Sequence, residues 1–294
     1  MLGEALSIGS ALTWALAVVL FKRGLQHSPE ATNLFKNVLA LVALGVTVLV
    51  LDIRVPDRSM DHWVRLGVSG VIGIAVADTL FFKSLERVGA SFMGVIQCAY
   101  APFVVLFSVI LLHESLSLGF GLGAAGVVGG VLIAASGELS TTTTSRRTLF
   151  EGAVLGVFSV GLMGYAIVLA KPALEASHLV EATLTRLVFG TAALLLWILI
   201  RPGTRKIVGV LRDPRAWRHL TAPSIVGAYF TMLLWIGGMK YTEASVSGVL
   251  CQLSTVFTLG FGALILHERL TVRHWVGGTL AMGSALIVVW LQGA

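Results

Sequence analysis

Long apolar stretches, separated by short polar breaks, follow one another along the whole chain. An α-helix needs about 17–25 mostly apolar residues to cross the hydrocarbon core of a bilayer. The pattern therefore predicts an all-α, polytopic membrane protein with ten transmembrane helices. The predicted spans are residues 5–21, 31–51, 63–82, 89–112, 116–136, 152–170, 179–200, 219–238, 244–266 and 272–291.

The composition places the chain in lipid rather than in water. Of the 294 residues, 56% are hydrophobic and only 12% are charged, and the mean hydropathy is +0.90. Soluble domains carry about 25% charged residues, so this chain has too few charges to cover its surface in water. Its 33 glycines fit the same class, because small residues let membrane helices approach one another closely.

The chain contains an internal repeat. The stretch FSVILLHESLSL at 107–118 returns as FGALILHERLTV at 261–272, and a shift of 154 residues makes ten of the 27 positions in 90–116 identical to 244–270. We expect two five-helix repeats, residues 1–136 and 152–294, joined by a linker at 137–151. Because five spans is an odd number, the second repeat must enter the membrane inverted. Inverted repeats are typical of secondary transporters.

The distribution of basic residues predicts the orientation. With the amino terminus outside, the inside loops hold fourteen of the 21 Lys and Arg residues and the outside loops hold five. Positive residues accumulate on the cytoplasmic side, so we expect a multi-pass protein of the plasma (inner) membrane with both termini outside the cytoplasm. Six of the fourteen lie in 201–218, a segment that we expect to contact anionic lipid headgroups rather than nucleic acid.

Both halves end in similar motifs. The first contains Pro102-Phe103, then Leu112-His113-Glu114-Ser115-Leu116 and a glycine-rich stretch at 119–130, and the second contains Leu266-His267-Glu268-Arg269-Leu270 followed by Gly277, Gly278 and Gly283. In these motifs the chain resembles the drug/metabolite transporter superfamily, of the EamA-like type, over nearly its whole length. The second half has Val256 where the family pattern has proline. The resemblance implies export or exchange of small solutes such as amino acids, related metabolites, drugs or nucleotide-linked compounds.

Three ionisable residues lie well inside the predicted spans, namely Lys36, Asp78 and Arg186. Charges within a bilayer are costly, and they commonly mark a substrate or ion path. Lys36 and Asp78 lie at the same depth, so they can pair. Asp78 is then either half of a structural ion pair or the group that takes a coupling proton or a substrate amine. Asn33 and Asn37 share a face with Lys36 and favour a wet cavity wall.

The repeat relates Arg186 to Lys36 at an offset of 150 residues. Since the repeats are inverted, we expect these two residues near opposite membrane surfaces. Each would then form a gate or an anion contact at one end of the substrate path. Asp78 has no acidic counterpart, because residue 232 is Met. Glu4 and Glu181 lie near span ends, where they are expected to face headgroups.

Further polar and aromatic residues are candidates for a substrate path. Gln97 and Gln252 lie near the same level of the fourth and ninth spans and are expected to contact a central cavity, since a buried amide needs partners. Aromatic walls would come from Trp14, Tyr100, Tyr165 and Tyr229, each of which could alternatively serve packing or interfacial anchoring.

Together these features favour a secondary active transporter, an exporter or exchanger of small metabolites such as amino acids or related amphipathic solutes, working by alternating access. A lipid-linked-substrate flippase or a channel is the alternative. A membrane enzyme is disfavoured because the chain has no H-E-x-x-H and no G-x-S-x-G motif. Cys98 and Cys251 lack metal-ligand spacing, so we expect no metal and no cofactor. The expected partners are a small-molecule substrate, membrane lipid and a coupling proton, without nucleic acid, in a monomer or weak homodimer.

Overall fold

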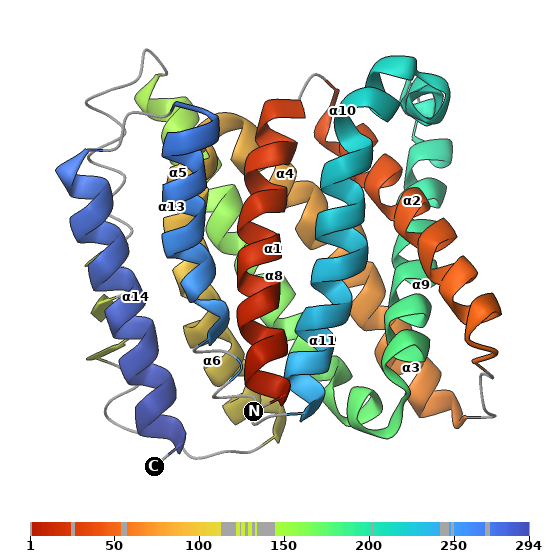
Figure 1. The fold of residues 1–294 in the computed structure, drawn as a ribbon, viewed down its shortest axis with the longest axis horizontal. Coiled ribbons are helices and arrows are strands. Elements are labelled where there is room, and N and C mark those ends of the chain that lie inside the picture. The colour runs from red at the N-terminus through yellow and green to blue at the C-terminus, as the bar shows by residue number, and fades with distance from the viewer. Residues whose placement is uncertain are drawn as a thin grey trace.

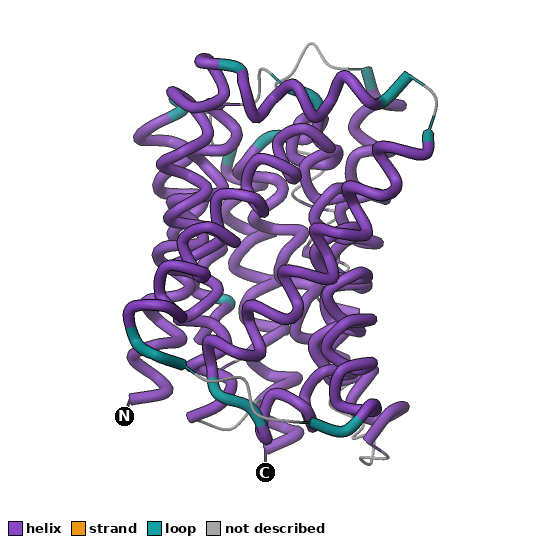
Figure 2. Tube along the Cα trace, turned by 90° about the vertical axis from the view of Figure 1, so that its right-hand side faces the viewer, coloured by secondary structure: helices purple, strands orange, loops and turns teal. Residues whose placement is uncertain are grey.

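In the computed structural model, the described part of the chain comprises residues 2–24, 27–53, 58–112, 145–201, 203–241, 247, 250–267 and 271–293, with separate positions between 122 and 133. All regular structure in these ranges is helical, and the helices run between two ends of the molecule that carry the loops (Figures 1 and 2). The all-α prediction is therefore confirmed for the described residues.

The helices fall into two series. The first series is α1 (Leu2–Gly24), α2 (Pro29–Val50), α3 (Met60–Gly70), η1 (Val71–Ala77), α4 (Asp78–Val88), α5 (Ala90–Ile96), η2 (Gln97–Ala99) and α6 (Tyr100–Leu112). The second is α8 (Arg146–Ala176), α9 (Leu179–Ile200), η3 (Arg205–Arg212), α10 (Pro214–Ser224), η4 (Ile225–Phe230), α11 (Thr231–Tyr241), α13 (Leu253–Ile265) and α14 (Val272–Gly293).

Seven continuous helical stretches are long and apolar enough to cross a membrane: Leu2–Lys22, Pro29–Val50, Met60–Val88, Ala90–Leu111, Arg146–Ala176, Leu179–Ile200 and Pro214–Tyr241. They coincide with seven of the predicted spans and confirm a multi-pass membrane protein. The apolar helix α13 is shorter, and α14 covers the predicted span 272–291. Most of the predicted span 116–136 and of the linker 137–151 lies outside the described residues, so the count of ten stays a prediction.

Polar caps fix where several helices begin. Ser28 accepts a hydrogen bond from the Ala31 backbone N–H, and Pro29 occupies the first turn of α2, where its missing N–H costs nothing. Asp213 and Pro214 do the same for α10. The His-Glu motif of the second half lies at a helix end, because His267 adopts the left-handed region at φ 55 just after α13 ends. Its predicted counterpart, His113, lies outside the described residues.

Two π-helical turns interrupt long helices at corresponding places. Residues 60–88 form α3, η1 and α4 without a break, and 214–241 form α10, η4 and α11. The turns begin at Val71 and Ile225, 154 residues apart. A π turn widens the helix and leaves carbonyls that need other donors. In η1, Asn33 Nδ2 donates to the Ile74 carbonyl at 2.8 Å and Ser159 Oγ donates to that of Ala77 at 2.7 Å.

The two series interlock in the middle of the bundle. The helix α1 packs along α11 and α13 of the second series, and α8 packs along α4 and α6 of the first (Figure 1). A close approach joins α3 and α9, because an added Cβ on Gly190 would lie 2.6 Å from the Gly70 carbonyl oxygen. These contacts bring residues from both series around the centre of the molecule.

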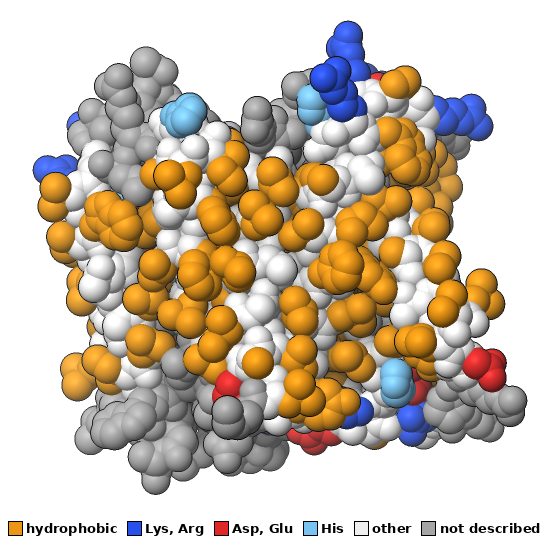
Figure 3. Space-filling view, viewed as in Figure 1, with side chains coloured by type: hydrophobic (Ala, Val, Ile, Leu, Met, Phe, Trp, Pro, Cys, Tyr) orange, Lys and Arg blue, Asp and Glu red, His pale blue; other side chains and the backbone are white. Residues whose placement is uncertain are grey.

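The outer surface matches a lipid environment. Hydrophobic side chains cover the middle of the face in Figure 3, whereas Lys and Arg gather at the end that carries η3 and α10. Exposed apolar residues include Val42, Val46 and Leu49 on one side of α2. A continuous apolar band of this kind is a liability in water and is stable in lipid. Both chain ends lie at the end opposite α10 (Figure 1).

Candidate functional site: a central cavity

A cavity of about 130 Å³ lies at the centre of the bundle, where helices of both series meet. Its walls come from α1, α2, η1, α4, α8, α9, η4 and α11, together with residues around η2 and at the start of α13. The lining residues are Ser10, Ala11, Trp14, Lys36, Gly73, Ile74, Asp78, Gln97, Tyr100, Val160, Met163, Arg186, Gly227, Thr231, Met232, Trp235, Cys251, Gln252 and Ser254.

Seven residues singled out from the sequence line this cavity: Trp14, Lys36, Asp78, Gln97, Tyr100, Arg186 and Gln252. They come from six separate segments of the chain. The cavity therefore collects the ionisable residues of the spans, both glutamines and two of the four aromatic candidates.

The predicted proximity of Lys36 and Asp78 is an ion pair in the structure. Lys36 Nζ lies 2.6 Å from Asp78 Oδ2, and both side chains are buried. Lys36 lies on α2, while Asp78 is the first residue of α4, directly after the π turn η1. The π turn thus sets the position of the carboxylate that faces α2.

Arg186 lies at the same cavity as Lys36, so the expectation of separate contacts at opposite mouths is wrong. Its side chain reaches the centre from α9, and only 2% of the residue is exposed. The guanidinium carbon lies 5.6 Å from the ring centroid of Trp235, a cation–π distance. Its Nε and Nη1 have no hydrogen-bond partner within the described ranges.

Corresponding positions of the two series line the same cavity. Lys36 and Arg186 are related by the offset of 150 residues, and the offset of 154 relates Gly73 to Gly227, Asp78 to Met232 and Gln97 to Cys251. All eight of these residues line the cavity. The walls are therefore similar in position but differ in charge, since an acid faces the cavity from the first series and a methionine from the second.

Asn33 and Asn37 do not form a wet cavity wall, which corrects the sequence-based interpretation. Both are buried, and neither lines the cavity. Asn33 donates to the Ile74 carbonyl and to Thr79 Oγ1 at 2.9 Å, while Asn37 Nδ2 donates to Asn33 Oδ1 at 3.1 Å. These amides hold α2 against the π turn, so their contribution to the site is positional.

Tyr165 and Tyr229 also lie outside the cavity lining. The Tyr165 ring packs edge-on against Phe107 at 5.3 Å, and the Tyr229 hydroxyl lies 2.7 Å from Thr47 Oγ1. The packing alternative holds for these two tyrosines. The aromatic wall comes instead from Trp14, Tyr100 and Trp235, and the Tyr100 and Trp235 ring centroids are 6.4 Å apart.

Sequence reasoning missed several lining residues, and some had a detectable signal. Cys251 and Gly227 follow from the repeat, because they correspond to Gln97 and Gly73. Nothing in the sequence identified Trp235 as a lining residue, because its position at the cavity depends on which side of α11 faces the centre of the bundle. No group of three His, Cys, Asp or Glu side chains suited to a metal gathers within the described residues.

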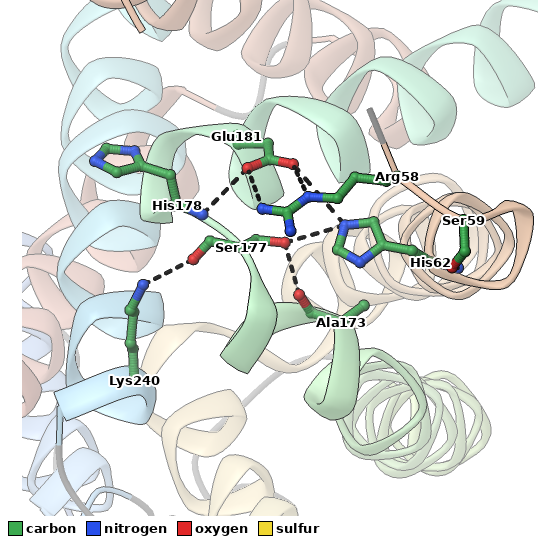
Figure 4. A network of polar contacts seen from close by, with 8 residues as sticks. All are labelled: Arg58, Ser59, His62, Ala173, Ser177, His178, Glu181 and Lys240. Carbon is green, nitrogen blue, oxygen red and sulfur yellow. Dashed lines mark hydrogen bonds and ion pairs between the residues drawn. The ribbon is translucent and has the colours of Figure 1, made fainter. Parts of the chain in front are cut away.

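A second polar group, the Glu181 cluster, lies outside the cavity and comprises Arg58, His62, Ser177, Glu181 and Lys240 (Figure 4). Glu181 is 1% exposed, so the expectation that it faces headgroups is wrong. It pairs with Arg58 through Nε–Oε1 at 3.2 Å and lies 3.9 Å from His62 Nε2.

The Glu181 cluster connects the two series. Arg58 and His62 precede or begin α3, whereas Ser177 and Glu181 lie at the junction of α8 with α9. Ser177 Oγ lies 3.1 Å from His62 Nε2, and Lys240 Nζ of α11 donates to the Ser177 carbonyl at 2.7 Å. One end of the bundle is thus held by polar contacts between series, at the end where α9 begins.

The fold and the cavity define a polytopic membrane protein with a small chamber between two sets of helices, in which a few charged and polar side chains lie among mostly apolar walls. The EamA-like transporter family matches residues 1–136 and 150–290. The chain belongs to this family and is a membrane transporter, which confirms the resemblance found in the sequence motifs.

Relatives and a solved structure agree with this placement. An uncharacterized transporter of Archaeoglobus fulgidus is 23% identical over 294 residues, covering 99% of each chain. An uncharacterized transporter of Synechocystis is 22% identical, covering 95% of this chain and 86% of that protein. A solved structure, described only as the crystal structure of a protein, matches with a TM-score of 0.67 at 15% identity over 98% of both chains. That likeness concerns the fold alone.

Proposed function

We propose that the protein is a secondary active transporter that exports or exchanges small metabolites, such as amino acids or related amphipathic solutes, by alternating access. The observation that carries the proposal is the central cavity, which corresponding positions of both series line. Its volume of about 130 Å³ suits a small solute, since a cavity of about 150 Å³ holds a benzene-sized ligand. Buried charges beside aromatic rings suit a solute with a polar head and an apolar body.

Alternating access is supported by the correspondence of the two series. The helices α2 and α9 each have 22 residues and begin at Pro29 and Leu179, 150 residues apart. The π turns η1 and η4 begin 154 residues apart. We infer two inverted five-helix repeats in a ten-helix protein. Inverted halves have inward-open and outward-open arrangements of similar energy, so a solute or proton can shift the population between them.

Proton coupling at Asp78 is part of the proposal. The carboxylate faces Lys36 from α2 and has the Arg186 charge of α9 nearby. Protonation would remove the only negative charge among the described lining residues and release Lys36 from its partner. Such a change alters the electrostatic free energy of the whole cavity, which is how a proton can bias one conformation over the other.

Transport in proteoliposomes tests the proposal. Purified protein is supplied with a panel of labelled amino acids and other small metabolites, with and without an imposed pH gradient. We expect saturable flux of at least one solute, and its accumulation should collapse when an uncoupler removes the gradient. Rapid, non-saturating flux would instead identify a channel, and movement of lipid-linked solutes alone would identify a flippase.

A matched pair of substitutions tests the role of Asp78. Asp78→Asn should abolish the response of transport to the pH gradient while solute binding persists. The control is Asp61→Asn, at a side chain that is 69% exposed and pairs with Arg65 one helical turn away. Unchanged pH dependence in Asp78→Asn would remove the proton from the mechanism and leave Asp78 as a structural partner of Lys36.

A further inference from the structure

The charges that line the cavity do not balance. Among the described lining residues, two are cations, Lys36 and Arg186, and one is an anion, Asp78. Asp78 is already engaged with Lys36 at 2.6 Å. A buried arginine that must share a nearby carboxylate with a lysine is incompletely compensated, because the interior cannot replace the water that the guanidinium loses. The cavity as it stands is therefore short of one negative charge.

The hydrogen-bonding state of Arg186 indicates where that charge belongs. Arginine carries five N–H donors and cannot accept. Its Nε and Nη1 are buried, and neither has an acceptor in the described part of the chain. Trp235 offers the guanidinium a π face, which does not replace hydrogen bonds in the plane. Buried polar groups left unpaired at a cavity are a common sign of a ligand that supplies the partner.

We propose that Arg186 is an anion subsite that selects solutes with a single negative charge, such as a carboxylate. One monoanion would balance the two cations and Asp78, whereas a phosphate monoester, with nearly two negative charges, would overcompensate. The apolar part of the solute would lie against Trp14, Tyr100 and Trp235, which line the same cavity. This inference rests on the proposed transport function, because it assigns the head group that the transported solute carries.

Three ring-sized probes that differ in charge test the subsite: benzoate, its neutral amide benzamide, and the cation benzylamine. The purified protein is placed in nanodiscs of neutral phosphatidylcholine, so that no anionic lipid competes for Arg186. Binding is measured by isothermal titration calorimetry, with empty nanodiscs as the blank for partitioning into lipid. Benzoate should bind at least about tenfold more tightly than benzamide, because hydrogen bonds between a guanidinium and a carboxylate are charge-assisted on both sides, whereas the amide is neutral.

Substitutions on the protein side complete the test. Arg186→Gln should abolish the preference for benzoate over benzamide, while Arg186→Lys, which keeps the charge, should retain a reduced preference. The control is Arg147→Gln, at a side chain that is 89% exposed and pairs only with Glu151 among the described residues. It should leave binding unchanged. If Arg186→Gln fails to fold, the comparison of the three probes on the unmodified protein still decides.

Equal binding of benzoate and benzamide would overturn the inference, as would a benzoate preference that survives in Arg186→Gln. Tighter binding of phenyl phosphate than of benzoate would overturn the assignment to a single charge. These outcomes are separable from failure of the proposed function. A protein that transports neutral solutes but does not prefer benzoate refutes only the subsite, whereas benzoate binding without any solute flux refutes only transport.

Discussion

At the scale of single residues, the Lys36–Asp78 pair places two opposite charges in the buried centre of the helix bundle. Removing one partner of a buried pair leaves an uncompensated charge, whereas replacing both by apolar residues is often neutral. The two partners are not equivalent here, because Arg186 lines the same cavity. Without Lys36, Asp78 still has a cation nearby. Without Asp78, two cations remain together.

We therefore predict an asymmetric double-mutant cycle. Asp78→Leu should lower the free energy of unfolding by about 3–5 kcal/mol, and Lys36→Met should lower it by less. The double variant should recover most of the stability. The measurement is thermal and denaturant unfolding of the purified variants in detergent. Losses that simply add in the double variant would mean that the pair contributes no coupling energy.

The pairing of Lys36 with Asp78 could be predicted because depth along two spans follows from counting residues in straight helices. The location of Arg186 could not. Counting places its Cα toward one surface, but the side chain is long and α9 approaches α3 closely through Gly70 and Gly190. The prediction that Tyr165 and Tyr229 line the cavity was wrong for a related reason. The position of a residue along a span does not indicate which side of the helix faces the cavity.

At the scale of helices, the contact between α9 and the α3–η1 segment decides how far Arg186 reaches into the cavity. A Cβ added at Gly190 would lie 2.6 Å from the Gly70 carbonyl oxygen and 2.7 Å from the Ile74 Cβ. The Gly70 oxygen is a main-chain atom and the Ile74 Cβ is bonded directly to the main chain, so neither atom can move away by a change of side-chain rotamer. The two helices would have to separate, and Arg186 would move with α9.

Gly190→Ala should accordingly destabilise the protein by about 1–3 kcal/mol, the usual cost of overpacking, and weaken benzoate binding. Gly45→Ala on α2 is the matched control, because nothing lies within 4 Å of an added Cβ there. That substitution should be neutral or stabilise by up to about 1 kcal/mol through helix propensity. Unfolding curves and titrations on both variants give the comparison. Equal behaviour of the two variants would show that the close approach is not limiting.

The π turns mark a limit of sequence reasoning at this scale. The length of the apolar stretches predicted the spans that contain η1 and η4, but the sequence VIGIAVA of η1 is that of an ordinary apolar helix. The π geometry depends on donors from elsewhere, such as Asn33 and Ser159, that bind the carbonyls of the turn. Local sequence does not contain that information. The repeat offset would nevertheless have related the two turns once either was known.

At the scale of the whole molecule, both chain ends lie at one end of the bundle, and the basic segment of η3 and α10 lies at the other (Figures 1 and 3). By the positive-inside rule we expect the basic end to face the cytoplasm. Reporter enzymes fused to each terminus should both be active only outside the cytoplasm, and a cysteine introduced in 201–218 should be labelled only from inside. Opposite reporter readings at the two termini would contradict an even number of crossings.

The Glu181 cluster joins the two series at the end where the termini lie (Figure 4). In an alternating-access transporter, contacts between halves at one end oppose opening there. Glu181→Gln removes the ion pair with Arg58 and should shift the population toward opening at that end. The cavity supplies the readout, because Cys251 lines it while Cys98 is fully buried. With Cys98→Ser in place, Cys251 is the single thiol of the chain.

We expect Glu181→Gln to increase the rate of Cys251 modification by a small water-soluble thiol reagent about fivefold or more, corresponding to about 1 kcal/mol. The control Glu151→Gln breaks a surface pair with Arg147 and should have no effect. In a Cys251→Ser background, Cys98 should stay unreactive in both variants. A matching rise at Cys98 would indicate unfolding rather than opening, and an unchanged rate at Cys251 would mean that the cluster does not hold this end closed.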